Sequence, residues 1–242
     1  SIPGFVATAE YMNFVTGPSG KTFNYADGGM GRGPDCALWW FARTLKRPDL
    51  VAGTERNLFV QYCQRRKGGS DRLFVFFLAW LQPRTENCTV KAPLCWSPGG
   101  IVPIAILRSS WNPTNSVFVG LKAGAPNGPH GHMDAGSFVY DAYGVRWAYD
   151  LGPENYNGIE QRGMNLWSFK QGSDRWKIFR LNNYSHNTLT LNNALQCATG
   201  AARVVAFDTE KEPTVTLDLT PMYPDVKTAT RQATLRTNNE LL

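Results

Sequence analysis

The sequence predicts an α+β protein in which several antiparallel helices are followed by an antiparallel β-sandwich. Two observations support this fold class. Residues 1 to about 85 carry apolar residues at helical spacing, whereas from Ile101 onward short runs of β-branched and aromatic residues alternate with Gly, Asn and Pro. A Pro-rich stretch from Pro83 to Pro103 separates the two patterns. We therefore expect a helical domain over 1–85, a linker over 86–103 and a sandwich over 104–242.

Helix start and stop signals divide the first half. Asp35 can cap a helix with its side chain, and Arg47 is pushed out of the helical region because it precedes a proline. The expected helices are 8–15, 36–45, a helix capped by Asp49 that runs to about Gln64, and 72–81 capped by Asp71. Short connections between strongly apolar helices predict antiparallel hairpins.

The second half reads as a series of short strands. The expected strands are 104–109, 116–121, 137–141, 145–150, 187–191, 202–207, 214–218 and 228–235. Tyr143-Gly144 lies between two of them and predicts a tight hairpin turn. Strands at this spacing are typical of an antiparallel sandwich.

Composition and charge narrow the class of protein. Of the 242 residues, 43% are hydrophobic and 18% are charged, as in folded globular proteins rather than disordered ones. The formal net charge of +6 favours anionic partners. The only dense basic cluster is Arg65-Arg66-Lys67, and no RNA-binding motif or zinc-finger spacing accompanies it, so we expect no nucleic-acid partner. No apolar run approaches the ~20 residues of a membrane span.

The cysteines leave the redox compartment open. Five cysteines show no Cys-x-x-Cys pair. Cys88 and Cys95 can bridge a loop in an oxidising compartment, and the odd count leaves at least one thiol unpaired within the chain. The chain shows no signal peptide and opens at Ser1 without Met, as a processed or excised piece would.

The three histidines concentrate the chemistry. His130 and His132 form a His-x-His pair in a glycine-rich segment, and on an extended strand both side chains would face one side. Asp150 closes one expected strand and His186 opens another, so a short hairpin can bring three ligands together. Imidazole and carboxylate groups are favoured ligands of zinc. The alternative is that each histidine is a satisfied polar residue with no ligand.

Several segments resemble the heparinase II/III-like family of polysaccharide lyases. The most specific is the block His130-Gly131-His132-Met133-Asp134-Ala135-Gly136-Ser137-Phe138, preceded by Val117-Phe118-Val119-Gly120-Leu121-Lys122. Trp147-Ala148-Tyr149-Asp150-Leu151-Gly152 with Tyr156, and Ser185-His186-Asn187-Thr188, resemble the family as well. Gly20-Lys21-Thr22-Phe23-Asn24-Tyr25-Ala26-Asp27 looks like the last hairpins of the family's (α/α) toroid, and Thr220-Pro221-Met222-Tyr223 with Arg231 looks like its later sandwich strands.

The resemblance implies a secreted or periplasmic lyase with an (α/α) toroid, a β-sandwich and a catalytic cleft. It implies a structural zinc on His132, Asp150 and His186, and a His130 that faces the uronic acid of an anionic polysaccharide such as a glycosaminoglycan or alginate. The reaction would be β-elimination, in which a base removes the C5 proton of a uronate and an acid protonates the departing O4.

The match to the family is incomplete. The family's usual catalytic Tyr and His lie on toroid helices upstream of the matched part, and the sandwich looks cut short after Leu242. We therefore expect this chain to carry one wall of the cleft without a full catalytic set.

Other residues and functions stay open. Tyr156 can touch the sugar or be a buried tyrosine, and Arg108 and Lys122 can bind carboxylate or sulfate groups, although solvated surface charge is the safer assumption. Asp134 either orients a ligand or stabilises a turn. The alternative function is a non-catalytic, glycan-binding or structural sandwich that keeps its metal for stability. A zinc hydrolase is a third, disfavoured because no general-base Glu lies near the histidines.

Overall fold

The computed structural model describes residues 4–65, 72–83, 92–237 and 239–241. The chain divides into two compact units. The first consists of Ser1–Thr16 and Gly31–Pro93, and the second of Gly17–Met30 and Leu94–Leu242. Residues 17–30, which the sequence analysis assigned to the helical part, are thus grouped with the strands. The predicted cap Asp71, Cys88 and two members of the basic cluster, Arg66 and Lys67, lie outside the described residues.

The first unit is helical. Its elements are η1 (Val6–Glu10), α1 (Tyr11–Val15), α2 (Cys36–Thr44), η2 (Pro48–Val51), α3 (Thr54–Gln64) and α4 (Phe74–Trp80). Asp35 caps α2 as predicted, because its carboxylate accepts a hydrogen bond of 3.0 Å from the amide of Ala37. The core of this unit centres on Trp39 and Phe77, both fully buried.

The helix predicted from Asp49 to Gln64 is wrong at its start. Asp49 lies inside the short 3-10 turn η2, where its carboxylate accepts hydrogen bonds from Arg47 instead of capping a helix. Gly53, at φ +62°, then separates η2 from α3, because most residues avoid this left-handed region. None of the helices described is long and apolar enough to cross a membrane.

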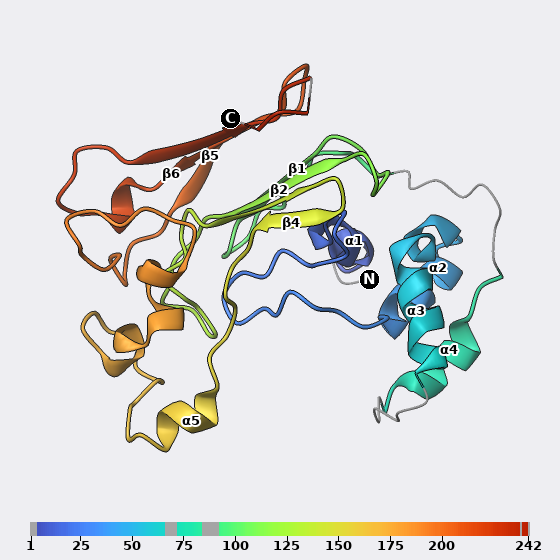
Figure 1. The fold of residues 1–242 in the computed structure, drawn as a ribbon, viewed down its shortest axis with the longest axis horizontal. Helices are drawn as coiled ribbons and strands as arrows, with labels where there is room; N and C mark the ends of the chain where they lie inside the picture. Colours follow the sequence, from blue (N-terminus) through green and yellow to red (C-terminus); the bar gives the residue numbers. More distant parts are fainter. Residues whose placement is uncertain (1–3, 66–71, 84–91, 238, 242) are drawn as a thin grey trace. The chain divides into compact units, whose positions relative to one another are not determined.

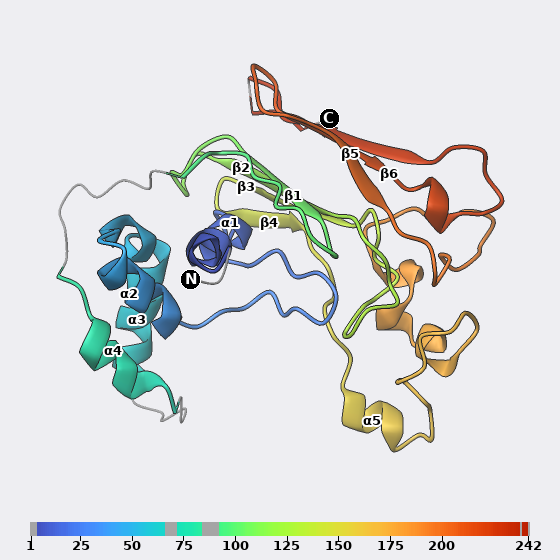
Figure 2. The same cartoon turned by 180° about the vertical axis from the view of Figure 1, so that it is seen from behind.

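The second unit contains two antiparallel sheets (Figures 1 and 2). One has the order β1 (Ile104–Arg108), β2 (Val117–Lys122), β3 (Phe138–Ala142) and β4 (Val145–Ala148); the other has the order β5 (Arg203–Asp208), β6 (Thr214–Asp218) and β7 (Thr230–Thr234). The predicted turn between β3 and β4 is confirmed, with Tyr143 and Gly144 at φ +51° and +78°. Shorter elements follow β4 and β6: α5 (Tyr156–Glu160), η3 (Asp174–Lys177), η4 (Phe179–Leu181), η5 (Asn183–Ser185) and η6 (Thr220–Met222).

Residues 187–191, predicted to form a strand, adopt no regular secondary structure. Side chains, rather than a strand ladder, hold them in place. The amide of Asn187 donates to the carbonyls of Phe138 and Tyr149 at 2.9 and 3.1 Å, and the hydroxyl of Thr188 donates to the carbonyl of Ala135 at 2.5 Å. Asn and Thr can replace backbone pairing in this way, which local strand propensity does not register.

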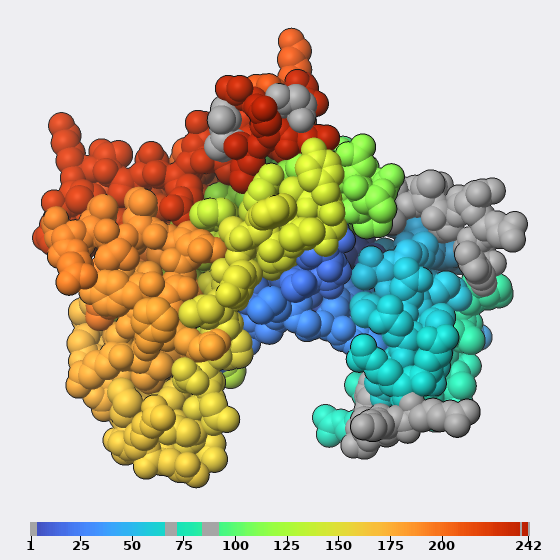
Figure 3. Space-filling view, in the orientation of Figure 1, coloured from blue at the N-terminus to red at the C-terminus, as the bar shows by residue number. Residues whose placement is uncertain are grey.

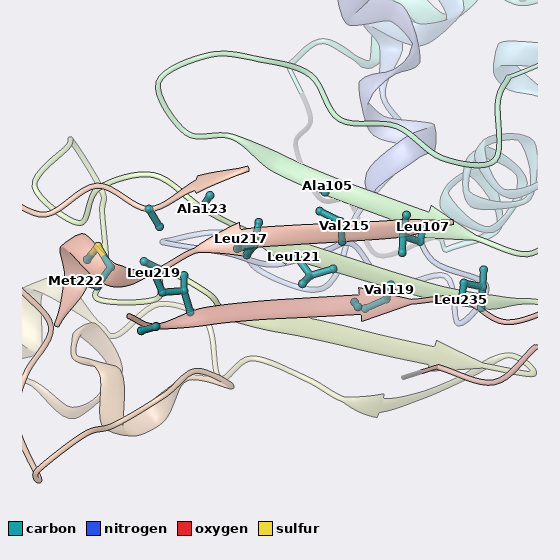
Figure 4. Packing of buried hydrophobic residues seen from close by; sticks show 14 of the residues in the cluster. Ala105, Leu107, Val119, Leu121, Ala123, Val215, Leu217, Leu219, Met222 and Leu235 are labelled. Atoms are coloured by element: carbon teal, nitrogen blue, oxygen red, sulfur yellow. The ribbon is translucent and has the colours of Figure 1, made fainter. Parts of the chain in front are cut away.

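The two sheets pack face to face through one apolar core (Figure 4). On β2, the side chains of Val119 and Leu121 belong to this core, together with Val215 and Leu217 from β6. Because side chains alternate along a strand, Phe118 and Gly120 face the opposite side of the sheet. All six residues of β2 are buried, so this strand is covered on both faces.

A loop formed by residues 17–30 covers that opposite face. Both cartoon views show this blue segment running along the sheet on the side away from β5 and β6. Its Phe23 packs directly against Gly120. The loop is closed at its base by a hydrogen bond of 3.0 Å from the amide of Thr22 to the carbonyl of Met30. This is the segment that carries Asp27 into the candidate site.

Candidate functional site

One carboxylate, that of Asp27, joins three candidate side chains. The Nε2 atom of His132 lies 2.8 Å from Oδ1 of Asp27, and the Nδ1 atom of His130 lies 2.7 Å from Oδ2. The hydroxyl of Tyr156 donates to the same Oδ2. These partners stand more than a hundred residues away along the chain. The sequence analysis named all three partners but gave Asp27 no role in the site.

The environment of Asp27 keeps it ionised. Burial by itself would raise the pKa of this carboxyl group, but hydrogen bonds from His132, Tyr156 and His130 outweigh burial and hold the pKa well below its usual range. A carboxylate only accepts hydrogen bonds. Each imidazole nitrogen that faces Asp27 therefore carries a proton and donates it.

His130 lies in a turn and His132 in the irregular segment that follows it, not on the extended strand that the His-x-His spacing suggested. His130 adopts φ +60°, which is uncommon for a residue other than glycine and is found mainly where the surrounding structure enforces it. A side chain at Gly131 would collide with the carbonyl oxygen of Pro126, only 2.2 Å from the Cβ position. The side chain of His130 is 67% exposed and that of His132 is fully buried. One imidazole can therefore meet a substrate, and the other cannot.

The three predicted metal ligands lie close together. The rings of His132 and His186 have centroids 5.3 Å apart, and Nδ1 of His186 lies 2.5 Å from Oδ2 of Asp150. Nδ1 of His132 and Nε2 of His186 are buried and have no hydrogen-bond partner among the described residues. In each ring the other nitrogen is bonded to a carboxylate, that of Asp27 for His132 and that of Asp150 for His186. The two remaining nitrogens can therefore each present a lone pair.

The carboxylates of Asp27 and Asp150 each bond to a ring nitrogen of one histidine and do not lie between the two rings. Asp150 bonds to His186, so it orients that ring in the manner of the second-layer carboxylates common at metal sites. Within the described part of the chain, no three His, Cys, Asp or Glu side chains converge closely enough to hold a metal ion by themselves. The donor set that fits a metal here is the pair of buried imidazole nitrogens, and the assignment of Asp150 as a third ligand stays a prediction.

A buried ion pair next to the site holds the backbone beside Asp27 in place. Lys122 and Asp134 are both essentially fully buried and are bonded to each other. The second oxygen of Asp134 accepts a hydrogen bond of 2.8 Å from the amide of Ala26. Burial would raise the pKa of Asp134, but the charge of Lys122 helps to lower it. Lys122 is therefore no surface charge, and Asp134 fixes the residue immediately before Asp27.

Tyr156 is presented by the start of α5. Asn155 caps this short helix, its side chain accepting a hydrogen bond of 2.9 Å from the amide of Gly158. Burial and the hydrogen bond to Asp27 raise the pKa of Tyr156, so its hydroxyl stays protonated as a donor. Trp167 lies edge-on to Tyr156 at 5.6 Å between ring centroids and is 59% exposed. An exposed aromatic ring thus lies beside the Asp27 cluster.

Arg175 is a second residue that sequence reasoning missed. Its guanidinium group is buried and donates to the carbonyl of Gly131 at 2.7 Å and to that of Leu166 at 3.0 Å. It therefore ties the segment of His130 and His132 to the segment of Trp167. Figure 3 shows the yellow and orange residues that follow β4 as one continuous mass of side chains.

The structure does not bring Arg108 to this cluster. Its side chain is 4% exposed and its guanidinium group lies over the rings of Trp111 and Phe118, 4.2 and 4.9 Å from their centroids. Burial lowers the pKa of Arg108 to about 10. It ends β1, whereas Lys122 pairs with Ile104 at the beginning of that strand. Strand alternation did not reveal this because both faces of the sheet are covered.

One family profile and several solved structures match this chain. The sequence profile described as Heparinase II/III-like, C-terminal, matches residues 104–238. A mutant of the heparan sulfate lyase HepC from Pedobacter heparinus has 19% sequence identity and a TM-score of 0.58, over 93% of this chain and 29% of that one. A heparinase III structure has 13% identity and a TM-score of 0.58, over 98% of this chain and 33% of that one.

These structural likenesses concern the fold. The chain spans about a third or less of the length of the solved structures it matches. No curated protein matches it.

Proposed function

The chain belongs to the heparinase II/III-like family, and from this premise we propose that it forms the sandwich wall of a polysaccharide lyase that cleaves uronate-containing anionic glycans by β-elimination. The observation that carries the proposal is the exposed imidazole of His130, held by Asp27 beside Tyr156. A net charge of +6 suits a polyanionic substrate. The structural relative from Pedobacter heparinus is a heparan sulfate lyase, which suggests a glycosaminoglycan as the first glycan to test.

The role proposed for His130 is to neutralise charge. In β-elimination a base takes the C5 proton, the electrons of that C–H bond form the C4=C5 double bond, and the C4–O4 bond breaks as O4 gains a proton. Negative charge builds on the uronate carboxylate as the proton leaves, and a positioned donor next to it lowers the barrier. Nδ1 of His130 is engaged with Asp27, so Nε2 is the atom that can reach the substrate, and it donates there when the ring carries a proton on both nitrogens. Tyr156 is the neighbouring candidate for sugar contact.

We also propose that His132 and His186 bind a zinc ion, with Asp150 as a third ligand or as the carboxylate that orients His186. The two buried nitrogens without partners in the described structure support this proposal, since buried polar atoms are nearly always paired. Zinc, when bound, would act structurally, by tying the segment of His132 to the segment of His186. The proton transfers are assigned to side chains and not to the metal.

An assay for unsaturated product tests the activity. The protein is purified with whatever sequence its gene encodes on either side of this chain, and is incubated with heparan sulfate, alginate and other uronate glycans while near-ultraviolet absorbance is followed. We expect product from at least one glycan, and a large loss of kcat in His130→Ala. Binding without product would favour the alternative, a glycan-binding or structural sandwich. The family resemblance also leads us to propose a secreted or periplasmic location, which fractionation of the native cells would test.

A further inference from the structure

We infer that Asp27 is the positioning residue of this site, and that it holds a proton on opposite ring nitrogens of the two histidines, Nδ1 of His130 and Nε2 of His132. The catalytic part of this inference rests on the proposed function; the tautomeric part does not. Asp27 is 19% exposed and lies between an exposed imidazole and a fully buried one. A single carboxylate therefore links the surface that meets the substrate to the pair of rings proposed to bind zinc.

The two oxygens of Asp27 have separate partners. Oδ1 faces Nε2 of His132, and Oδ2 faces Nδ1 of His130 and the hydroxyl of Tyr156. Because an ionised carboxylate accepts only, His132 must carry its proton on Nε2 and His130 must carry its proton on Nδ1. The atoms left over are then Nδ1 of His132, which is buried, and Nε2 of His130, whose side chain is exposed.

Hydrogen bonds at both ends of the 17–30 loop restrain the position of Asp27. At one end, the hydroxyl of Ser19 donates to Asp141 at 2.5 Å, and Arg146 donates to the carbonyls of Lys21 and Thr22 at 3.2 and 3.1 Å. Arg146 and Asp141 are themselves a buried ion pair. These contacts fix the loop to β3 and β4.

At the other end, the residues beside Asp27 are fixed as well. The amide of Ala26 donates to Asp134, and the side chain of Asn24 donates to the carbonyl of Asp150 at 2.9 Å. Ala26 adopts φ +51°, a conformation that the neighbouring contacts must enforce. A catalytic group has to be held within a fraction of an ångström, and a rigid supporting layer is what provides this. We therefore place Asp27 in that supporting layer and not among the groups that touch the substrate.

The tautomers can be read in the wild-type protein. Long-range ¹H–¹⁵N correlation spectra distinguish a protonated from an unprotonated ring nitrogen, and His130→Gln and His132→Gln variants assign the signals. We expect a proton on Nδ1 of His130 and on Nε2 of His132. A proton on Nε2 alone of His130, or on Nδ1 of His132, would overturn the inference. This result is independent of whether any glycan is cleaved.

Variants of Asp27 test the consequence for activity. Asn has one acceptor oxygen and one amino group, so Asp27→Asn can accept hydrogen bonds from either His132 or the pair His130 and Tyr156, but not from both. We expect kcat to fall roughly 10–100-fold with KM little changed, the range typical for losing an orienting carboxylate, and Asp27→Glu to recover part of it. Asp208→Asn, which changes an exposed carboxylate on β5, should leave kcat unchanged.

The outcomes separate the inference from the proposed function. If Asp27→Asn keeps full kcat and wild-type tautomers, Asp27 is no positioning residue. If Asp27→Asn does not fold, the inference is decided by the proton positions read from the ¹H–¹⁵N spectra of the wild-type protein. If the expected tautomers are seen while the wild-type protein cleaves no glycan, the arrangement stands and the lyase proposal fails.

Discussion

Gly120 of β2 and Phe23 of the 17–30 loop touch so closely that no side chain fits between them. A Cβ atom on Gly120 would lie 2.6 Å from Cδ1 and 2.7 Å from Cγ of the Phe23 ring, well inside van der Waals contact. The glycine lets the loop lie flat on the sheet. Four residues beyond Phe23, the loop presents Asp27 to His130 and His132. The small size of Gly120 on β2 thus determines how close the loop, and with it the carboxylate of Asp27, lies to the sheet.

Gly120→Ala should destabilise the protein and disturb the site. The added methyl group forces Phe23 or the strand to move, and such overpacking costs about 1–3 kcal/mol. Urea unfolding measures this cost. Gly29→Ala is the matched control, because Gly29 belongs to the same loop and has nothing within 4 Å of its Cβ position. Equal stabilities of the two variants would contradict the close contact.

Removal of zinc should lower the stability of the protein, and zinc binding should not depend on His130. If His132 and His186 bind the ion, a chelator should lower the midpoint of thermal unfolding, since a ligand bound only by the folded state stabilises it. We expect His132→Ala and His186→Ala to lose zinc, as measured by elemental analysis, and His130→Ala to retain it. Loss of zinc in His130→Ala alone would reverse the roles assigned to the two neighbouring histidines.

Lys122→Met should be strongly destabilising. It leaves the carboxylate of Asp134 buried without its charged partner, a change that typically costs about 3–5 kcal/mol. Lys177→Met is the control, because the pair of Lys177 and Asp174 is exposed, and such pairs contribute roughly 0–1 kcal/mol. The double variant Lys122→Met/Asp134→Leu should recover much of the loss in denaturant unfolding. A single variant as stable as its control would mean that Asp134 is not buried as described.

Trp167→Ala should weaken substrate binding more than turnover. The ring is exposed beside Tyr156, and its indole N–H donates to Glu160 at 2.8 Å, which fixes its orientation; an exposed aromatic face of this kind suits the proposed sugar substrate. We expect KM to rise several-fold with kcat nearly unchanged in the absorbance assay. Trp167→Phe keeps an aromatic face and should lie closer to the wild type. An unchanged KM in Trp167→Ala would remove this ring from the substrate path.

Sequence patterns predicted what depends on neighbours along the chain. The cap Asp35, the turn Tyr143-Gly144 and seven of the eight strands follow from local rules of capping, turns and alternation. The grouping of His132, Asp150 and His186 was also predicted from the sequence, because a glycine-rich segment marked His132 and the ends of expected strands marked Asp150 and His186.

What failed depends on contacts between distant segments. Asp27 looked like part of a helical region, and the site role of this carboxylate appears only when residues 105 positions apart meet. Arg108 looked like a surface charge because alternation assumes one solvated face, and this sheet has none at that point. Asn187 and Thr188 looked like strand residues, but their side chains take over the pairing.

The chain passes between the two compact units three times, after Thr16, after Met30 and after Pro93. During synthesis Asp27 leaves the ribosome before Tyr156, which follows 129 residues later. At about 5–20 residues per second, this gap is on the order of ten seconds. Until β2 and the other strands of its sheet have followed, the 17–30 loop has no sheet to lie on, so Phe23 stays uncovered. The helices on either side of residues 17–30 therefore have to fold while this loop is still unpacked. The site is completed by the later strands of the second unit and not by the folding of the helices.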